Sequence, residues 1–273
     1  MKNTFPAPDA MLLDSYLRQL RLATFGTQHA KLAAEAAAAN LGYERYLLSL
    51  AEAEVQQREI QQQTRRIRQA HLPVLKELAD FDFTLVAKAL KPLILELARG
   101  EYMARAEPII LVGNPGLGKT HIAIALALCA CRQRHKVRFY NAAALVNDLL
   151  EAQSQNQLNR FIQLAQRQQL IVLDELGFIP FSAQGAQLIF QFCAALYEHV
   201  TLILTTNLRF ADWPQVFGDE RLTAALLDRL THRAHILEFV GESFRFRDSA
   251  QRLSRRERQP AALTSPAAAQ KGG

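Results

Sequence analysis

From residue 108 onward, short apolar runs alternate with longer segments whose apolar residues recur every three or four positions. Continuous apolar runs are typical of strands buried on both faces, and the longer spacing is typical of helices. This alternation predicts an α/β fold with a five-stranded parallel sheet flanked by helices. The runs cover 109–112, 137–140, 170–173, 202–205 and 236–239, and the helical segments cover 118–134, 143–152, 156–168, 183–199 and 219–232.

Before residue 71 the pattern is helical throughout. Leu13, Leu17 and Leu20 recur at helical spacing, and residues 30–39 are mostly alanine, a good helix former. Gly42 separates this part from a long helix over 43–70, which Pro73 closes, and residues 74–85 are expected to be a linker. The chain is therefore predicted to hold an all-helical N-terminal domain over 1–75, which binds DNA or a partner or forms oligomers. An α/β domain follows over 76–250, and a disordered basic tail over 251–273.

Composition and charge narrow the function. Hydrophobic residues make up 49% of the 273 positions, a fraction that excludes wholesale disorder. The formal net charge of the chain is +6. Residues 1–76 and 245–273 carry an excess of three and five basic side chains, whereas 77–244 carry an excess of two acidic ones. A near-neutral centre with basic ends indicates an anionic partner, with nucleic acid the obvious candidate. The alternative is that the basic tail only aids solubility.

Several protein classes are excluded. Three cysteines are too few for a disulfide scaffold, and the N-terminus lacks the apolar stretch of a signal peptide. The longest apolar run, 122–130, falls short of the roughly 20 residues that cross a bilayer. We therefore expect a soluble cytoplasmic protein with no membrane partner.

A phosphate-binding pattern, Gly-x-x-x-x-Gly-Lys-Ser/Thr, follows the first apolar run. Its glycines let backbone N–H groups approach phosphate oxygens, and its lysine reaches the β- and γ-phosphates. The threonine hydroxyl binds Mg²⁺ at a helix N-terminus that favours the anion. The strand–loop–helix context favours this site over a glycine-rich turn without a ligand. The pattern consists of Gly113, Asn114, Pro115, Gly116, Leu117, Gly118, Lys119 and Thr120.

Polar residues follow two other apolar runs. Asp174 ends the third run and is a candidate Mg²⁺ ligand, while the adjacent Glu175 is a candidate general base for water. Alone, an Asp–Glu pair after a strand is more often a helix N-cap region. Asn207 follows the fourth run and can orient the same water, although a lone asparagine is more often a turn former.

Phosphoryl transfer also needs a cation for the charge that develops on the γ-phosphate. The downstream candidates are Arg221, Arg229, Arg233, Arg245 and Arg247. Arg229 lies near the end of an apolar helix, where an arginine usually reaches an anion or a subunit boundary. Pairing with Asp228 or extension into solvent is the alternative.

Together these segments resemble the IstB-like ATP-binding helper proteins of insertion-sequence transposons, which are AAA+ ATPases close to DnaC-type helicase loaders. The resemblance spans roughly residues 10–248 and includes Phe81-Asp82-Phe83 near the predicted linker. The DELGF, WxxxFGD and LLDRL segments are more specific than the phosphate loop. The matching stretches are GNPGLGKTHIA (113–123), LDELGF (173–178), TTNL (205–208), WPQVFGD (213–219), ALLDRL (225–230) and GESFR (241–245).

The resemblance implies roles for single residues. The phosphate loop corresponds to Walker A, in a stretch that also contains His121, and Asp174 and Glu175 correspond to Walker B. Asn207 corresponds to the first sensor, and Arg229 to an arginine finger that acts on ATP in a neighbouring subunit. Arg245 is a weaker candidate for a nucleotide- or DNA-facing residue. The implied protein is a slow, DNA-stimulated, Mg²⁺-dependent ATPase that forms homo-oligomers on duplex DNA, remodels it and recruits a partner transposase.

Two departures from the family pattern, and one expected absence, affect this picture. Leu196 stands where the family often has arginine, which leaves open slower hydrolysis or a scaffold without turnover. Asn114 replaces a common proline in a turn that tolerates asparagine. We also expect no large C-terminal helical lid after the fifth strand, so a neighbouring subunit would close the nucleotide site. The alternative function is a DnaC-like loader of a replicative helicase.

Overall fold

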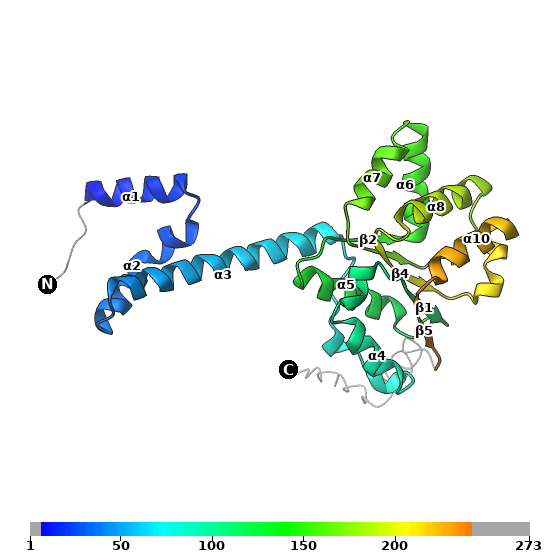
Figure 1. Cartoon of the computed structure of the whole chain (residues 1–273), viewed down its shortest axis with the longest axis horizontal. Helices are drawn as coiled ribbons and strands as arrows, with labels where there is room; N and C mark the ends of the chain where they lie inside the picture. Colours follow the sequence, from blue (N-terminus) through cyan, green and yellow to red (C-terminus); the bar gives the residue numbers. More distant parts are fainter. Residues whose placement is uncertain (1–6, 242–273) are drawn as a thin grey trace, which may run out of the picture. The chain divides into compact units, whose positions relative to one another are not determined.

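A computed structural model describes residues 7–241, and Figure 1 shows the chain. The chain divides between Gln69 and Ala70 into two units, and each is described by itself. In the described part, no helix is long and apolar enough to cross a membrane. The predicted tail over 251–273 and the expected absence of a C-terminal lid both concern residues outside the described range.

The first unit is helical, as predicted, and contains α1 (Ala7–Gln19), α2 (Ala23–Ala38) and most of α3 (Tyr43–Ala70). One break was not predicted. Arg21 adopts a left-handed conformation (φ +57°) and separates α1 from α2 inside a segment whose apolar spacing is continuous. The expected break near Gly42 is present, because α3 begins at the next residue.

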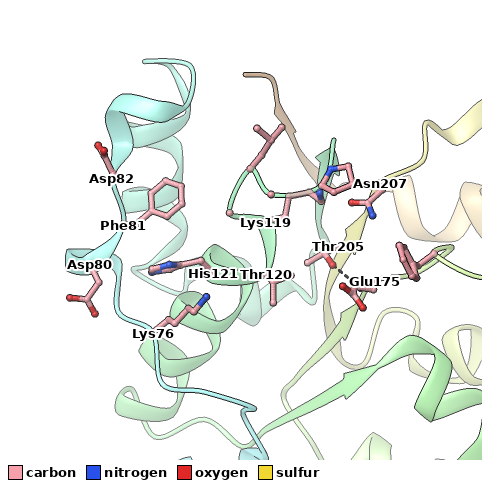
Figure 2. Close-up of a pocket in the computed structure, with 15 residues that line it drawn as sticks. Lys76, Asp80, Phe81, Asp82, Lys119, Thr120, His121, Glu175, Thr205 and Asn207 are labelled. Carbon is pink, nitrogen blue, oxygen red and sulfur yellow. Dashed lines mark hydrogen bonds between the residues drawn. The ribbon is translucent and has the colours of Figure 1, made fainter. Parts of the chain in front are cut away.

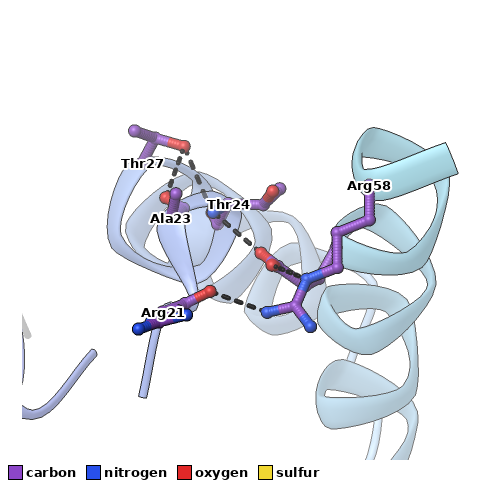
Figure 3. A network of polar contacts seen from close by, with 6 residues as sticks. Arg21, Ala23, Thr24, Thr27 and Arg58 are labelled. Carbon is purple, nitrogen blue, oxygen red and sulfur yellow. Dashed lines mark hydrogen bonds and ion pairs between the residues drawn. The ribbon is translucent and has the colours of Figure 1, made fainter. Parts of the chain in front are cut away.

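A buried carboxylate joins the second and third helices of this unit. Leu22, at the N-cap of α2, offers no side-chain acceptor, and Glu54 of α3 accepts the Thr24 backbone N–H at 2.9 Å instead. Arg58 donates to Glu54 at 2.6 Å and to the Arg21 carbonyl oxygen at 2.7 Å (Figure 3). Burial raises the pKa of Glu54, but the hydrogen bonds from Thr24 and Arg58 outweigh it and hold that pKa below its ordinary value.

The second unit contains a five-stranded sheet in the order β2-β3-β4-β1-β5, and every pairing is parallel. The predicted α/β fold with a five-stranded parallel sheet is confirmed. The strands are β1 (Ile109–Gly113), β2 (Val137–Asn141), β3 (Leu170–Asp174), β4 (Thr201–Thr206) and β5 (His235–Phe239). The larger helices are α4 (Leu90–Leu97), α5 (Lys119–Arg132), α6 (Ala142–Ser154), α7 (Leu158–Gln166), α8 (Ala183–Leu196) and α10 (Glu220–Thr231).

Helices cover both faces of the sheet, which explains why every residue of β3 and β4 is buried. Helix α5 packs against β1, β3 and β4, whereas α6, α8 and α10 enclose the other face (Figure 1). Alternate residues of one strand contribute to the two cores, so Ile171 and Leu173 belong to the α6–α8 side. Three central strands therefore bring the ends that carry Gly113, Asp174 and Thr206 to one edge of the sheet.

Several shorter elements were not predicted. The expected linker over 74–85 holds two 3-10 turns, η1 (Leu78–Asp80) and η2 (Phe83–Leu85), and α4 follows it. A third turn, η3 (Glu101–Arg105), leads into β1, while η4 (Phe210–Asp212) and the short α9 (Pro214–Phe217) follow β4. Helix α8 ends at Leu196, three residues before the predicted end, because Glu198 adopts a left-handed conformation (φ +62°).

Candidate functional site

The loop between β1 and α5 can be formed only by glycine at two of its positions. Gly113 has φ +149°, and a Cβ on it would lie 2.2 Å from the Phe239 carbonyl oxygen. Gly118 has φ +88°, and a Cβ there would lie 2.5 Å from Cε2 of Phe81. Gly116 also has a positive φ of 82°. The glycines of the phosphate pattern are therefore required by the backbone and by its close neighbours.

Lys119 begins α5 and is buried, with 6% of its surface exposed. Its Nζ donates to the Gly113 carbonyl oxygen at 2.6 Å and to the Asn114 carbonyl oxygen at 2.8 Å. The loop thus holds the ammonium group at its centre through backbone oxygens. A phosphate group can offer stronger, charged acceptors to the same donor.

Thr120, Asp174 and Thr205 form a hydrogen-bonded cluster beside the loop. The hydroxyls of Thr120 and Thr205 donate to Asp174 Oδ1 at 2.8 and 2.6 Å, and Asp174 is buried. Hydroxyl and carboxylate oxygens are the ligands that Mg²⁺ prefers when phosphate oxygens complete its shell. The described residues contain no group of three or more His, Cys, Asp or Glu suited to a metal. The Thr120 hydroxyl and the Asp174 carboxylate fit Mg²⁺ bound together with a nucleotide.

Glu175 follows Asp174 in a left-handed conformation with φ +61°. Its backbone N–H donates to Thr205 Oγ1 at 2.8 Å, which fixes the turn after β3 to β4. Its carboxylate accepts a hydrogen bond of 3.1 Å from Asn141 Nδ2, at the end of β2. Three neighbouring strands thus position this carboxylate, which lines the same pocket as the phosphate loop (Figure 2).

The pocket has a volume of about 440 Å³, enough for a nucleotide. The side chains of Lys119 and Thr120 lie at its centre, with Glu175 and Asn207 on one side (Figure 2). Its lining residues are Lys76, Asp80, Phe81, Asp82, Pro115, Gly116, Leu117, Gly118, Lys119, Thr120, His121, Glu175, Phe178, Thr205 and Asn207. Gly113 and Asn114 do not line it and instead supply the carbonyl oxygens that bind Lys119.

The opposite wall comes from the segment expected to be a linker. His121 Nε2 lies 2.8 Å from the Glu77 carbonyl oxygen, and the rings of His121 and Phe81 meet edge to face at 5.2 Å. The Glu77 carboxylate also accepts two hydrogen bonds from Arg132 near the end of α5. These contacts fix residues 76–82 against α5, so this segment is part of the pocket.

One predicted residue lies away from the pocket lining, and another is outside the described residues. Arg229 stacks over the ring of Phe190 at 5.2 Å and donates to the Ala225 carbonyl oxygen at 2.7 Å, so it lies on α10 away from the lining. Arg245 lies outside the described residues. Leu196, the departure from the family pattern, is fully buried in the core between α8 and its neighbours.

Sequence reasoning missed other parts of this site. Asn141 ends an apolar run, which is the same signal that identified Asn207, and could have been found in that way. Phe178 projects from the turn after β3, with 65% of its surface exposed, and gives no signal beyond the family motif. Lys76, Asp80 and Asp82 belong to a polar segment without periodicity, so only the fold reveals that they face the phosphate loop.

This sheet order, with a glycine-rich loop and an acidic strand end meeting at one edge, defines a P-loop nucleotide-binding protein of the AAA+ class. Residues 15–252 match the family described as IstB-like ATP binding protein, and the chain belongs to that family. It is 36% identical over 236 residues to an IS21 insertion sequence ATP-binding protein of Pseudomonas aeruginosa, covering 86% of this chain and 89% of the relative.

Other comparisons agree. The chain is 32% identical to an IS5376 insertion sequence ATP-binding protein of Geobacillus stearothermophilus, covering 86% of this chain and 94% of the relative. The crystal structure of the DnaC helicase loader is similar with a TM-score of 0.50 and 19% identity, over 64% of this chain and 99% of that one. The structure of the replication initiator DnaA bound to AMPPCP and single-stranded DNA is similar with a TM-score of 0.52 and 19% identity, over 70% of this chain and 58% of that one. These two likenesses confirm the AAA+ fold.

Proposed function

We propose that the protein is an ATP-dependent, DNA-binding transposition helper that hydrolyses ATP with Mg²⁺. The observation that carries this proposal is the meeting of Lys119, Glu175 and Asn207 in one pocket beside the Thr120–Asp174 pair. Membership of a family whose relatives are named insertion sequence ATP-binding proteins supports the transposition role. We propose that the protein acts in the cytoplasm.

The arrangement suits the hydrolysis of the terminal phosphate. A water molecule attacks the γ-phosphorus of ATP, the bond from that phosphorus to the β–γ bridging oxygen breaks, and ADP and phosphate leave. Glu175 accepts the proton of the attacking water, and Asn207 orients that water. Lys119 binds the β- and γ-phosphate oxygens. Mg²⁺ neutralises charge on the phosphates when bound, and Thr120 and Asp174 would hold it.

A second cation for the γ-phosphate comes from another subunit in this proposal. The side chain of Arg229 is partly exposed on α10 and lies outside the pocket of its own chain. An arginine supplied from a neighbour would complete the site only in an oligomer, which couples hydrolysis to assembly. We propose that the protein forms homo-oligomers on duplex DNA, remodels this target DNA and recruits a transposase.

The test is ATP turnover by the purified chain with and without duplex DNA. Duplex DNA is expected to raise turnover, because it promotes the assembly that brings Arg229 to a neighbouring pocket. Glu175→Gln should lower turnover by roughly 10²–10⁴-fold while ATP binding survives, since only the proton acceptor is lost. Turnover of Glu175→Gln at the normal rate would show that Glu175 is not the general base.

The alternative role, loading a replicative helicase, shares the fold and the pocket. Capture of native partners by the Glu175→Gln protein separates the two roles, because stalled hydrolysis retains the assembled state. Recovery of the transposase supports the proposal, and recovery of a helicase alone contradicts it. A nucleotide-bound scaffold without turnover would give no ATP hydrolysis with or without DNA.

A further inference from the structure

Two segments of the second unit combine basic residues with an absence of acidic ones. Residues 152–173 contain no Asp or Glu, and their charged residues are Arg160 and Arg167 among many glutamines and asparagines. Residues 132–138 read RQRHKVR, and that segment also contains no acid. Neither segment contributes to the nucleotide pocket. Apart from Arg132, which binds Glu77 of the pocket wall, their basic residues have no part in the function assigned above.

Helix α7 presents its basic residues on its solvent face. Ile162 and Ala165 are buried against the core, whereas Arg160, Gln163 and Arg167 are exposed. Arg160 and Arg167 are seven residues apart, which places them on one side of the helix about 10 Å from each other. Gln163 lies between them with an amide that can donate a hydrogen bond. This face offers an acceptor two guanidinium groups and an amide N–H, and it carries no carboxylate.

The second segment is held next to the end of α7. Lys136 N–H donates to Gln169 Oε1 at 2.9 Å, and Gln169 N–H donates to the Lys136 carbonyl oxygen at 2.9 Å. Arg134, which follows α5 with φ +72°, is exposed, as is Lys136. The loops before β2 and β3 thus form one platform. We call the exposed residues Lys136, Arg160 and Arg167 the basic surface.

Neighbouring charges leave this surface positive. Arg132 is bound to Glu77, and Arg138 stacks over the ring of Tyr140 at 5.3 Å, so neither is counted in it. Within residues 7–241, no ion pair involves Lys136, Arg160 or Arg167.

We propose that the basic surface binds the phosphate backbone of duplex DNA. Guanidinium, ammonium and amide donors are the groups that contact phosphates without reading sequence. The two loops lie at the amino ends of the strands, whereas the nucleotide pocket lies at the carboxyl ends. A five-residue strand separates these edges by roughly 17 Å, so ATP and DNA bind at the same time. This inference rests on the DNA binding in the proposed function.

The experiment measures DNA affinity of the full chain, with ATP and Mg²⁺, for a fluorescent random-sequence duplex between about 50 and 200 mM salt. The test variant is Lys136→Gln/Arg160→Gln/Arg167→Gln. Each lost contact to B-DNA reduces the slope of log affinity against log salt by roughly 0.9, so a slope shallower by about 2–3 is expected. Affinity should fall at least about tenfold, while ATP affinity stays unchanged.

The matched control removes the same charge elsewhere, as Lys88→Gln/Arg99→Gln/Arg221→Gln, from three exposed positions outside both segments. Its slope should change by less than about one. Equal slopes for the test and control variants would overturn this inference, because net charge alone would then explain binding. Wild-type protein that does not bind duplex DNA at all would instead overturn the proposed function.

A gain of affinity provides an independent measurement that misfolding cannot mimic. Gln163→Lys adds a cation between Arg160 and Arg167 and should steepen the salt slope by about one. Gln215→Lys adds the same charge at an exposed position of α9 and should leave the slope nearly unchanged. An equal gain from both substitutions would contradict a localised surface.

Discussion

Asn141 Nδ2 donates a hydrogen bond of 3.1 Å to Glu175 Oε2, so the carboxylate proposed to activate water is held by a side chain from the neighbouring strand. The same asparagine caps α6, because its Oδ1 accepts the Ala143 N–H at 3.1 Å and the Ala144 N–H at 3.4 Å. The cap fixes which end of the amide faces Glu175, since the oxygen is already engaged. Asn141 is therefore a positioning residue for the proposed base.

Replacing Asn141 by alanine is expected to separate catalysis from ATP binding. The loss of one hydrogen bond of about 1 kcal/mol corresponds to a roughly fivefold fall in kcat, because Glu175 is less well oriented. The KM for ATP should stay constant, since Asn141 does not line the pocket. Steady-state ATPase kinetics check both values. An unchanged kcat with a raised KM would contradict this role.

Aspartate at the same position is the matched control for the cap. Asn141→Asp keeps an acceptor for α6 but places a carboxylate where the donor to Glu175 was, so kcat should fall while the cap of α6 is retained. Asn141→Ala should in addition lower the free energy of unfolding by about 1 kcal/mol, because the cap is lost. Thermal unfolding of the two variants, measured without nucleotide, distinguishes the two contributions. Equal stability of both would show that the cap contributes nothing.

Lys119→Ala is expected to abolish measurable ATP binding, with a loss of at least about 100-fold in affinity, since a charged donor to phosphate is removed. The same change leaves two loop carbonyl oxygens without their donor. Titration calorimetry with ATP and Mg²⁺ measures the affinity. Thr84→Ala, outside the pocket lining, serves as a control and should bind ATP normally. Retained affinity in Lys119→Ala would show that the nucleotide does not occupy this loop.

The sequence predicted those parts of the site that lie next to regular elements. Strand ends such as Asp174 and Asn207 were found because a parallel sheet collects the carboxyl ends of its strands at one edge. The pocket wall around Phe81 could not be found in this way, because its position depends on tertiary contacts with His121 and Arg132. The break at Arg21 was missed for a similar reason. Glu54, a residue distant in sequence, supplies the acceptor at that helix N-terminus.

The Glu54 network predicts acid sensitivity of the first unit. The pKa of Glu54 is held below its ordinary value, so its stabilising contribution is present above the unfolded-state pKa. That contribution is lost as the pH falls through the lower, folded-state pKa. Glu54→Gln should reduce helix stability at neutral pH by about 1–3 kcal/mol, because a charged acceptor for Arg58 is removed.

Helical circular dichroism of the full chain against pH checks the Glu54 prediction, with Glu52→Gln as the control at an exposed position of α3. Glu54→Gln should flatten the loss of stability as the pH falls from the unfolded-state pKa through the lower, folded-state pKa, since the group that titrates is absent. Glu52→Gln should leave the wild-type profile in place. Identical profiles for all three proteins would show that Glu54 does not link the fold to pH.

The contact between Gly118 and Phe81 predicts a stability cost that depends on both residues. Gly118→Ala places a Cβ 2.5 Å from Phe81 Cε2 at φ +88°, so the free energy of unfolding should fall by about 1–3 kcal/mol. Adding Phe81→Ala removes the clash but not the backbone strain, and should recover part of that loss. Gly26→Ala, within α2 and with nothing near its added Cβ, should instead stabilise by roughly 0.5–1 kcal/mol. Chemical denaturation of five proteins measures these differences: wild type, Gly118→Ala, Phe81→Ala, the double variant and Gly26→Ala. Strict additivity of the Gly118 and Phe81 changes would show that the ring does not rest on the loop.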